Sequence, residues 1–421
     1  MFKIQSVEIT GFWQRFSASC VFNDDVNIII GRNGTGKTTF MNILHSVLSV
    51  DIDTIDNNDF ESIEIKLKNG KQTKTIRAKK INDDMSPFFT IEYQISRRKY
   101  VVRAIQSDDR RVATHYRRKA MQESIELRTE LAKLVSLSSL SVYRLRSGEE
   151  FEIPDRNGLR AITPVDFRLS QLLQQLTKYQ LDLSQQARDI ALDLQKEVLA
   201  SILYSKEDTY EINGIANFNK EKEKEDLLSA YNQLNANDNS VRRKIISHVD
   251  AIDKTLSDLR QNSKKDQDVN IDVRPIEAYR NTQKIIKMSL NAEKKTSDIF
   301  SPIDLFIRIL TEFILDKKFK FVGGELEISN SFGGIKNDAL SSGEKQLLIL
   351  FIETLLQRSK PYVFLTDEPE LSLHIAWQRK IIPAIRKLNP YAQVIAATHS
   401  PEVASKFRDS IHDMEKVVAH V

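Results

Sequence analysis

The stretch VNIIIGRNGTGKTTFMNILHSVL, Val26–Leu48, decides how the chain folds. It begins with a short apolar run typical of a buried strand, and its last part has the spacing of a helix. Between them lies GRNGTGKTT, Gly31–Thr39, which has every fixed position of a phosphate-binding loop. Glycines let backbone N–H groups surround phosphates at a helix N-terminus, where the helix dipole also favours anions. The stretch therefore predicts an α/β fold with a nucleotide site.

Individual roles follow from the chemistry of this loop. We expect Lys37 to reach the β- and γ-phosphates and the Thr38 hydroxyl to bind Mg²⁺. The other residues expected to bind phosphate are Gly31, Arg32, Asn33, Gly34, Thr35, Gly36 and Thr39. A glycine-rich turn between a strand and a helix is the alternative.

Two later strands end in polar residues. YVFLTDEPE, Tyr362–Glu370, is a short apolar strand that ends in two carboxylates. We expect Asp367 to hold Mg²⁺ through water, and Glu368 to orient or polarise the water that attacks the γ-phosphate. QVIAA is followed by His399, a candidate for contact with the γ-phosphate. The alternatives are surface acids that cap the next turn and a structural histidine.

The polar segment LSSGEKQ, Leu340–Gln346, precedes the apolar run LLILFIETLL. Ser341 and Glu344 have the S-x-x-E spacing of a capping box, which predicts that a helix begins here. Because Gly343 has no large side chain, this helix N-terminus is also open to an anion. Ser341, Ser342, Gly343 and Glu344 are therefore candidates for binding a phosphate.

Composition limits the class of protein. A chain of 421 residues with 41% hydrophobic residues and a net charge of +4 can form two or three globular domains. Cys20 is its only cysteine, which excludes an intrachain disulfide and a cysteine-based zinc site. No apolar run reaches the length of about 18 residues that a membrane helix needs. We therefore expect a cytoplasmic protein with no membrane partner.

The pattern of apolar residues changes twice along the chain. The first hundred residues alternate as strands do, the middle has helical spacing, and the last part returns to short strands and helices. We therefore predict an α/β domain in two pieces, residues 1–110 and 301–421, separated by a helical, coiled-coil-like insertion of residues 111–300. Within this chain, Arg97–Lys119 holds nine Lys or Arg against two Asp. It suits nucleic acid or an acidic protein, with a solvated surface as the alternative.

Five motifs together resemble those of ABC-type ATPases and occur in the same order: GRNGTGKTT, LSSGEKQ, FLTDEPE, LSLH and ATHS. Among these proteins the chain is similar to the non-transporter branch, the SMC, RecF and OLD group, including ATPase subunits of bacterial anti-phage defence systems. The resemblance covers the two ends of the chain and leaves out its helical middle. It implies an ABC-type P-loop nucleotide-binding domain with a large, mostly helical insertion, and ATP and Mg²⁺ as cofactors.

The resemblance also assigns motif names. Gly31–Thr39 become the Walker A loop, Asp367 and Glu368 the Walker B carboxylates, Ser372–His374 part of the D-loop, and His399 the switch histidine. LSSGEKQ resembles the ABC signature, with Ser342 in place of the transporters' glycine and Glu344 in place of their glutamine. Gln94 is the candidate for the Q-loop glutamine.

The function that the resemblance implies is ATP hydrolysis by a head-to-tail dimer, in which the signature of one protomer faces the Walker A loop of another. The working unit is then a homodimer or a higher oligomer. Its nucleotide state controls a separate effector protein, with a nuclease as one candidate, in anti-phage defence. One alternative is a RecF- or SMC-like DNA-binding ATPase of repair or replication. Another is a nucleotide-gated scaffold with little turnover, against which the intact Glu368 argues.

Overall fold

The computed structural model describes residues 1–82, 88–105, 120–139, 151–155, 158–201, 218–233, 238–262, 274–370 and 373–420. The chain divides into two compact units, Met1–Thr177 with Leu305–Val421, and Lys178–Asp304. The second unit is helical in its described residues, and it begins well after residue 111. The reason is that helix α4 (Ile125–Leu134) and strand β8 (Leu137–Ser139) pack against the core of the first unit.

A parallel sheet in the first unit carries the predicted phosphate-binding loop. Its strand order is β16-β3-β15-β14-β8, and each pair of neighbours runs parallel. β14 and β15 are buried almost throughout, which explains their uninterrupted apolar sequences. The α/β class is thus confirmed. Besides β8, this sheet contains β3 (Val26–Ile30), β14 (Tyr362–Asp367), β15 (Ala392–Ala397) and β16 (Ile411–Asp413).

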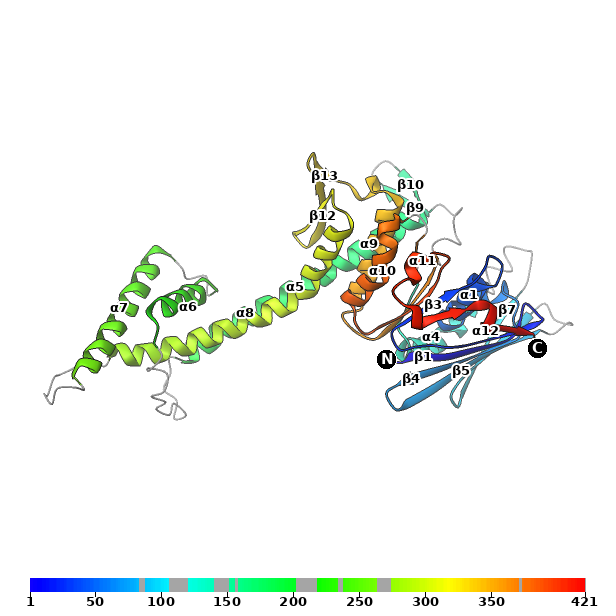
Figure 1. Cartoon of the computed structure of the whole chain (residues 1–421), viewed down its shortest axis with the longest axis horizontal. Helices are drawn as coiled ribbons and strands as arrows, with labels where there is room; N and C mark the ends of the chain where they lie inside the picture. Colours follow the sequence, from blue (N-terminus) through cyan, green and yellow to red (C-terminus); the bar gives the residue numbers. More distant parts are fainter. Residues whose placement is uncertain are drawn as a thin grey trace. The chain divides into compact units, whose positions relative to one another are not determined.

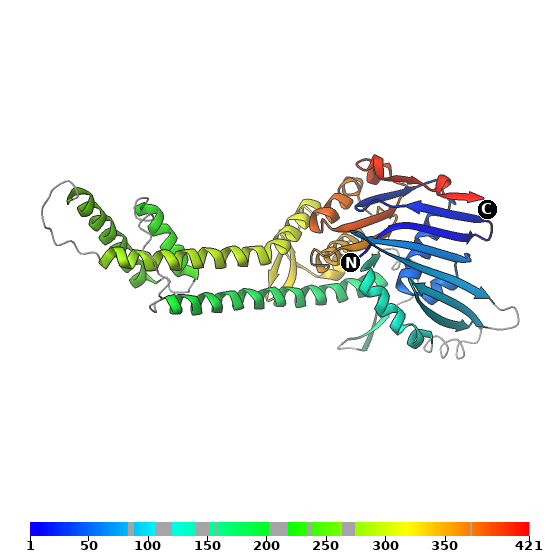
Figure 2. The same cartoon turned by 90° about the horizontal axis from the view of Figure 1, so that it is seen from below.

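A separate antiparallel sheet of seven strands forms most of the N-terminal part (Figure 2). Its order is β17-β2-β1-β4-β5-β6-β7, and alternate side chains, such as Ile63 and Ile65, are buried. A tight turn at Asn69-Gly70, a sequence typical of hairpin turns, joins β4 to β5. The bounds are β1 (Lys3–Phe12), β2 (Phe16–Val21), β4 (Ser62–Asn69), β5 (Gln72–Asn82), β6 (Phe88–Ile95), β7 (Arg98–Ile105) and β17 (Val418–His420).

Helix α1 (Lys37–Ser49) shares one hydrophobic core with both sheets. Its inner residues Phe40, Ile43, Leu44 and Val47 are fully buried. They lie in the same cluster as Ile9 of the antiparallel sheet and Ile395 of the parallel sheet. The helix that follows the phosphate-binding loop is therefore packed against both sheets. The short helix α2 (Ile52–Asp56) follows it in the chain.

Further elements complete the first unit. The helix predicted after LSSGEKQ is α9 (Ser342–Leu356), and α10 (Ile375–Leu388) follows β14. A hairpin before them consists of β11 (Lys318–Val322) and β12 (Glu325–Asn330). The remaining short elements are β9 (Phe151–Asp155), β10 (Gly158–Ile162), β13 (Gly333–Ile335), α11 (Pro401–Ala404) and α12 (Met414–Val417).

Four helices make up the part of the second unit that the structure describes (Figure 1). The long helices α5 (Pro164–Ser201) and α8 (Arg274–Phe313) contribute residues to both units, whereas α6 (Lys220–Gln233) and α7 (Asn239–Asn262) belong to the second alone. α6 and α7 pack through a narrow apolar stripe that includes Leu227, Ala230, Ile245 and Val249. Across the part of the chain that the structure describes, we find no helix with the length and apolar character needed to span a membrane.

Candidate nucleotide site

The loop between β3 and α1 has the conformation that its glycines predict. Gly36 is the N-cap of α1 and has a φ of 92°. A Cβ atom there would lie 2.8–2.9 Å from the rings of Phe12 and Trp13, so only glycine fits this position. Lys37, Thr38 and Thr39 form the first turn of the helix, and the exposed residues Arg32, Asn33 and Gly34 form the tip of the loop. The loop thus presents the N-terminus of a 13-residue helix to solvent.

Lys37 folds back over this loop. Its Nζ atom donates to the carbonyl oxygens of Gly31 at 2.9 Å and Arg32 at 3.0 Å. The residue is only 5% exposed, and this burial lowers the pKa of the ammonium group, while the charges of Glu368 and Asp367 act in the opposite direction. A cation held among partly desolvated groups is well placed to bind an anionic phosphate.

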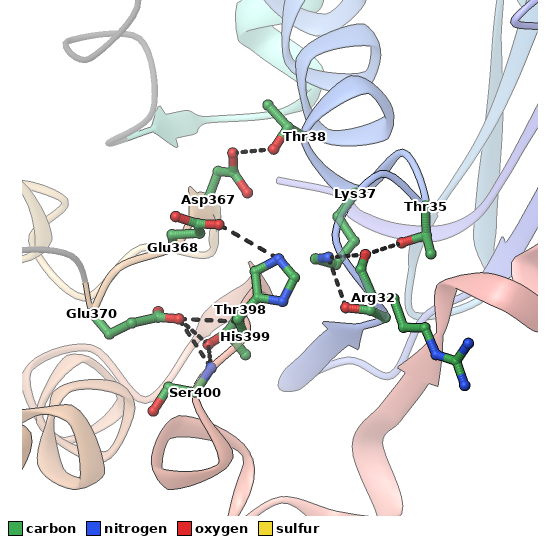
Figure 3. Close-up of polar contacts among 11 residues, drawn as sticks. Arg32, Thr35, Lys37, Thr38, Asp367, Glu368, Glu370, Thr398, His399 and Ser400 are labelled. Carbon is green, nitrogen blue, oxygen red and sulfur yellow. Dashed lines mark hydrogen bonds and ion pairs between the residues drawn. The ribbon is translucent and has the colours of Figure 1, made fainter.

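Thr38 and Asp367 meet although 329 residues separate them in sequence. The Thr38 Oγ1 atom donates to Asp367 Oδ2 at 2.8 Å (Figure 3). Hydroxyl and carboxylate oxygens are the ligands that Mg²⁺ prefers, so the two residues fit this cation. Among the described residues, no group of three or more His, Cys, Asp or Glu side chains could hold a metal ion.

Glu368 and His399 face each other across the ends of two neighbouring strands. His399 Nε2 lies 3.6 Å from Glu368 Oε1, and both side chains are partly exposed, at 35% and 29%. The backbone of Glu368 has a φ of 47°, a left-handed conformation that is uncommon for a residue other than glycine. Strain of this kind is concentrated at functional sites. The structure thus brings the expected water-activating carboxylate next to the expected γ-phosphate contact.

Glu370 is a site residue that the sequence analysis missed. One of its carboxylate oxygens accepts hydrogen bonds from the turn that carries His399 (Figure 3). The only sequence signal was a third acid in FLTDEPE, two residues beyond Glu368. Its partners come from the end of β15 and could not be inferred without the strand register.

The predicted capping box at the start of α9 is confirmed. Ser341 Oγ accepts from the Glu344 backbone N–H at 3.3 Å, and the Ser341 N–H donates to Glu344 Oε2 at 2.9 Å. Lys317 Nζ also lies 2.6 Å from Glu344 Oε1. Among the described residues, no hydrogen bond or ion pair joins Ser341–Glu344 to the phosphate-binding loop. The two motifs are thus not brought together by contacts within one chain.

The remaining predicted site residues are those of the D-loop, the basic segment and Gln94. Ser372 lies outside the described residues, whereas His374 caps α10 by accepting from the Ala376 N–H at 3.2 Å. Of the basic segment Arg97–Lys119, residues 106–119 also lie outside the described part, Arg97 lies in a turn, and Arg98–Ile105 forms β7. Gln94 lies on β6 of the antiparallel sheet, where its Nε2 donates to the Ser96 carbonyl oxygen at 2.9 Å.

Sequence comparisons identify relatives. The profile of a family described as "AAA domain, putative AbiEii toxin, Type IV TA system" matches residues 26–405. The "Septu protein PtuA" of Bacillus thuringiensis is 34% identical over 108 residues, a match that covers 21% of this chain and 27% of that protein. The "Retron Ec83 probable ATPase" of Escherichia coli is 28% identical over 141 residues, 30% of this chain and 26% of that protein. The matches thus span about a quarter of each relative's length.

Solved structures with a similar arrangement include Smc heads. The Smc head domain of Pyrococcus furiosus, with an extended coiled coil and bound to the C-terminal domain of ScpA, has a TM-score of 0.42 and 13% identity. That comparison covers 96% of this chain and 92% of the other. The SMC head domain from Thermotoga maritima has a TM-score of 0.40 and 10% identity, with coverage of 98% and 94%.

Proposed function

Because the chain belongs to the AAA domain family whose profile matches residues 26–405, we propose that it binds ATP with Mg²⁺ and hydrolyses it to ADP and phosphate. The observation that carries this proposal is the convergence shown in Figure 3. The loop after β3, the carboxylates at the end of β14 and the histidine after β15 meet at one edge of the parallel sheet. Ligands of open α/β sheets bind at this carboxyl edge.

The binding step uses the loop and the first turn of α1. Backbone N–H groups of Gly34, Gly36 and their neighbours would bind phosphate oxygens, and Lys37 would exchange its two carbonyl partners for the β- and γ-phosphates. Thr38 and Asp367 would hold Mg²⁺ on the other side of the phosphates. When bound, the cation supplies positive charge that neutralises the phosphate oxygens.

The hydrolytic step uses the two groups at the strand ends. Glu368 would orient a water molecule and accept its proton as the water attacks the γ-phosphate. His399, 3.6 Å from that carboxylate, would donate a hydrogen bond to the same phosphate. Glu368 is the catalytic base in this proposal because it lies beside His399 and its charge acts on Lys37 of the phosphate-binding loop.

Lys37→Ala is expected to weaken ATP binding by about 10- to 100-fold, because the loss of a hydrogen bond to a charged group costs about 1.5–3 kcal/mol. Isothermal titration calorimetry with ATP and Mg²⁺ measures the change. Lys406→Ala is the matched control, since Lys406 is an exposed lysine of the same unit. Equal affinity of the Lys37 variant and the wild type would contradict the placement of ATP at this loop.

We further propose that the active unit is a head-to-tail dimer. Helix α9 begins at the Ser341 cap, next to the buried Gly343. Among the described residues of one chain, this cap makes no hydrogen bond to the phosphate-binding loop. A second protomer would bring its Ser341–Glu344 segment to the γ-phosphate. Helix N-termini of this kind bind anions through their free N–H groups.

Mixing two inactive variants tests this arrangement. Lys37→Ala weakens phosphate binding and Ser341→Arg blocks the cap, so at an ATP concentration near the wild-type Kd each homodimer is expected to be almost inactive. A heterodimer contains one site in which both motifs are intact, and random pairing therefore restores about a quarter of the wild-type rate. ATPase activity is measured before and after mixing. If activity stays absent while the mixed protomers still associate, the shared site is refuted.

The proposed role is control of a separate effector, which fits anti-phage defence. Two observations support it, the resemblance of the motifs to ATPase subunits of such systems and the names of the relatives, a Septu protein and a retron ATPase. The second unit would pass the nucleotide state to the effector through the long helices α5 and α8, since both contain residues of each unit. Co-purification of an effector in an ATP-dependent manner tests this role.

A further inference from the structure

Two turns lie next to each other at the carboxyl edge of the parallel sheet. β14 and β15 are neighbours in register, with Asp367 opposite Ala397. The turn after β14 runs from Glu368 to Glu370, and the turn after β15 is Thr398–Ser400. The Glu368 N–H donates to the Ala397 carbonyl oxygen at 2.7 Å, which ties the two turns together at their base.

Glu370 ties the same turns together at their far end. Its Oε1 atom accepts three hydrogen bonds, from Thr398 Oγ1 at 2.5 Å and from the backbone N–H groups of His399 and Ser400 at 3.1 Å each. Thr398 is fully buried. Three donors on one carboxylate oxygen are charge-assisted bonds, which are shorter and stronger than neutral ones. The backbone on both sides of the His399 side chain is thereby fixed to the turn that carries Glu368.

Gln378 of α10 supports this arrangement from a third element. Its Oε1 atom accepts from Ser400 Oγ at 2.8 Å, and its Nε2 atom donates to the Leu373 carbonyl oxygen at 3.2 Å. The turn after β15 is thus bonded both to Glu370 and to the helix that follows β14. Neither Glu370 nor Gln378 bonds to the phosphate-binding loop among the described contacts.

We propose that Glu370 is a positioning residue, which holds the His399 imidazole beside Glu368. The inference rests on the hydrolytic function proposed above and assigns a role to a third carboxylate of FLTDEPE. Because Glu370 bonds to the backbone of His399 and not to the loop that binds phosphate, it acts on the chemical step rather than on ATP binding. A displacement of about 1 Å at a catalytic group can cost about 100-fold in rate.

Variants of Glu370 test whether the positioning role depends on the length of the side chain or on its charge. Glu370→Ala is expected to lower kcat by about 10- to 100-fold and to leave the KM for ATP unchanged. Glu370→Gln keeps an acceptor oxygen at the same reach and is expected to retain most of the rate. Glu370→Asp keeps the charge but is one methylene shorter, so it is expected to behave like the alanine variant. A higher rate for Asp than for Gln would overturn the positioning role.

A double variant shows whether Glu370 acts through His399. Glu370→Ala combined with His399→Ala is expected to be no slower than His399→Ala alone, since the histidine to be positioned is absent. Losses that multiply would overturn the proposal. NMR of the imidazole groups gives a readout independent of activity. Signals that disappear in His399→Ala belong to His399, and they are expected to shift in Glu370→Ala while those of His45 do not.

Glu402→Ala serves as the matched control. Glu402 is a carboxylate of the neighbouring helix α11 that pairs with Arg379 and makes no bond to His399 in the described structure. Its removal is expected to leave kcat and the His399 signals unchanged. The proposed function is tested separately by Glu368→Gln. Absence of ATP hydrolysis by the wild-type protein would refute the function, and wild-type hydrolysis by Glu368→Gln would refute the role of Glu368 as the base. An inactive Glu368→Gln with a fully active Glu370→Ala would refute only the positioning role.

Discussion

Glu368→Gln is expected to lower kcat for ATP hydrolysis by about 10²- to 10⁴-fold, the usual contribution of a general base. The amide has almost the same shape as the carboxylate, but it cannot accept the proton of the attacking water. Because the phosphate contacts of Lys37 and the Mg²⁺ ligands remain, the affinity for ATP is expected to stay near that of the wild type. Steady-state phosphate release gives kcat, and calorimetry gives the affinity.

Glu368→Gln also tests whether ATP joins two protomers into a dimer. If ATP joins two protomers and hydrolysis separates them, Glu368→Gln accumulates the ATP-bound dimer, which light scattering coupled to gel filtration detects. Glu312→Gln, a change at an exposed carboxylate that pairs with Lys387, is expected to hydrolyse ATP and to show no such accumulation. A Glu368→Gln protein that hydrolyses ATP at the wild-type rate would show that another group activates the water.

The sequence predicted the elements of the site because each has a strong local pattern. A strand, a glycine-rich loop and a helix follow one another in Val26–Leu48, and the capping box at Ser341 needs only four adjacent residues. The pairing of Thr38 with Asp367 could be expected from the order of the motifs. It was not visible in spacing, since 329 residues separate the two side chains.

The bonds between neighbouring elements could not be predicted in the same way. Glu370 finds its partners on the end of β15, and which residues lie opposite each other depends on the register of two strands. Glu353 presents a similar case, because it is an acid within the apolar run LLILFIETLL. Its burial becomes understandable only with Arg168, which comes from another helix 185 residues away. A sequence pattern readily shows which residues are buried. It shows much less readily which residue pairs with a buried charge.

Helix α8 illustrates how tertiary packing can maintain a helix through a proline. The predicted helical insertion ended at residue 300, two residues before Pro302. In the structure, α8 continues through Pro302 to Phe313. A proline inside a helix removes one backbone hydrogen bond, but Phe306, Ile309 and Leu310 beyond it are fully buried in the first unit. The apolar contacts of this segment outweigh the lost bond.

Arg168→Met is expected to lower the free energy of unfolding of the first unit by about 3–5 kcal/mol, the usual cost of removing one partner of a buried ion pair. Arg168 of α5 donates from Nε at 3.0 Å and from Nη2 at 2.6 Å to Glu353 Oε1. Ser138 Oγ of β8 donates to the other oxygen at 2.7 Å. The Glu353 side chain is only 5% exposed, so methionine would leave a buried carboxylate without its compensating charge.

Urea unfolding followed by tryptophan fluorescence measures this loss, because both tryptophans of the chain, Trp13 and Trp377, belong to the first unit. The matched control is Arg379→Met, which removes an exposed partner of Glu402 and is expected to cost less than about 1 kcal/mol. The double variant Arg168→Met, Glu353→Leu is expected to recover much of the stability, since no buried charge remains. If the double variant is as unstable as Arg168→Met, the arginine stabilises the fold through its packing, and the buried charge of Glu353 is not the cause.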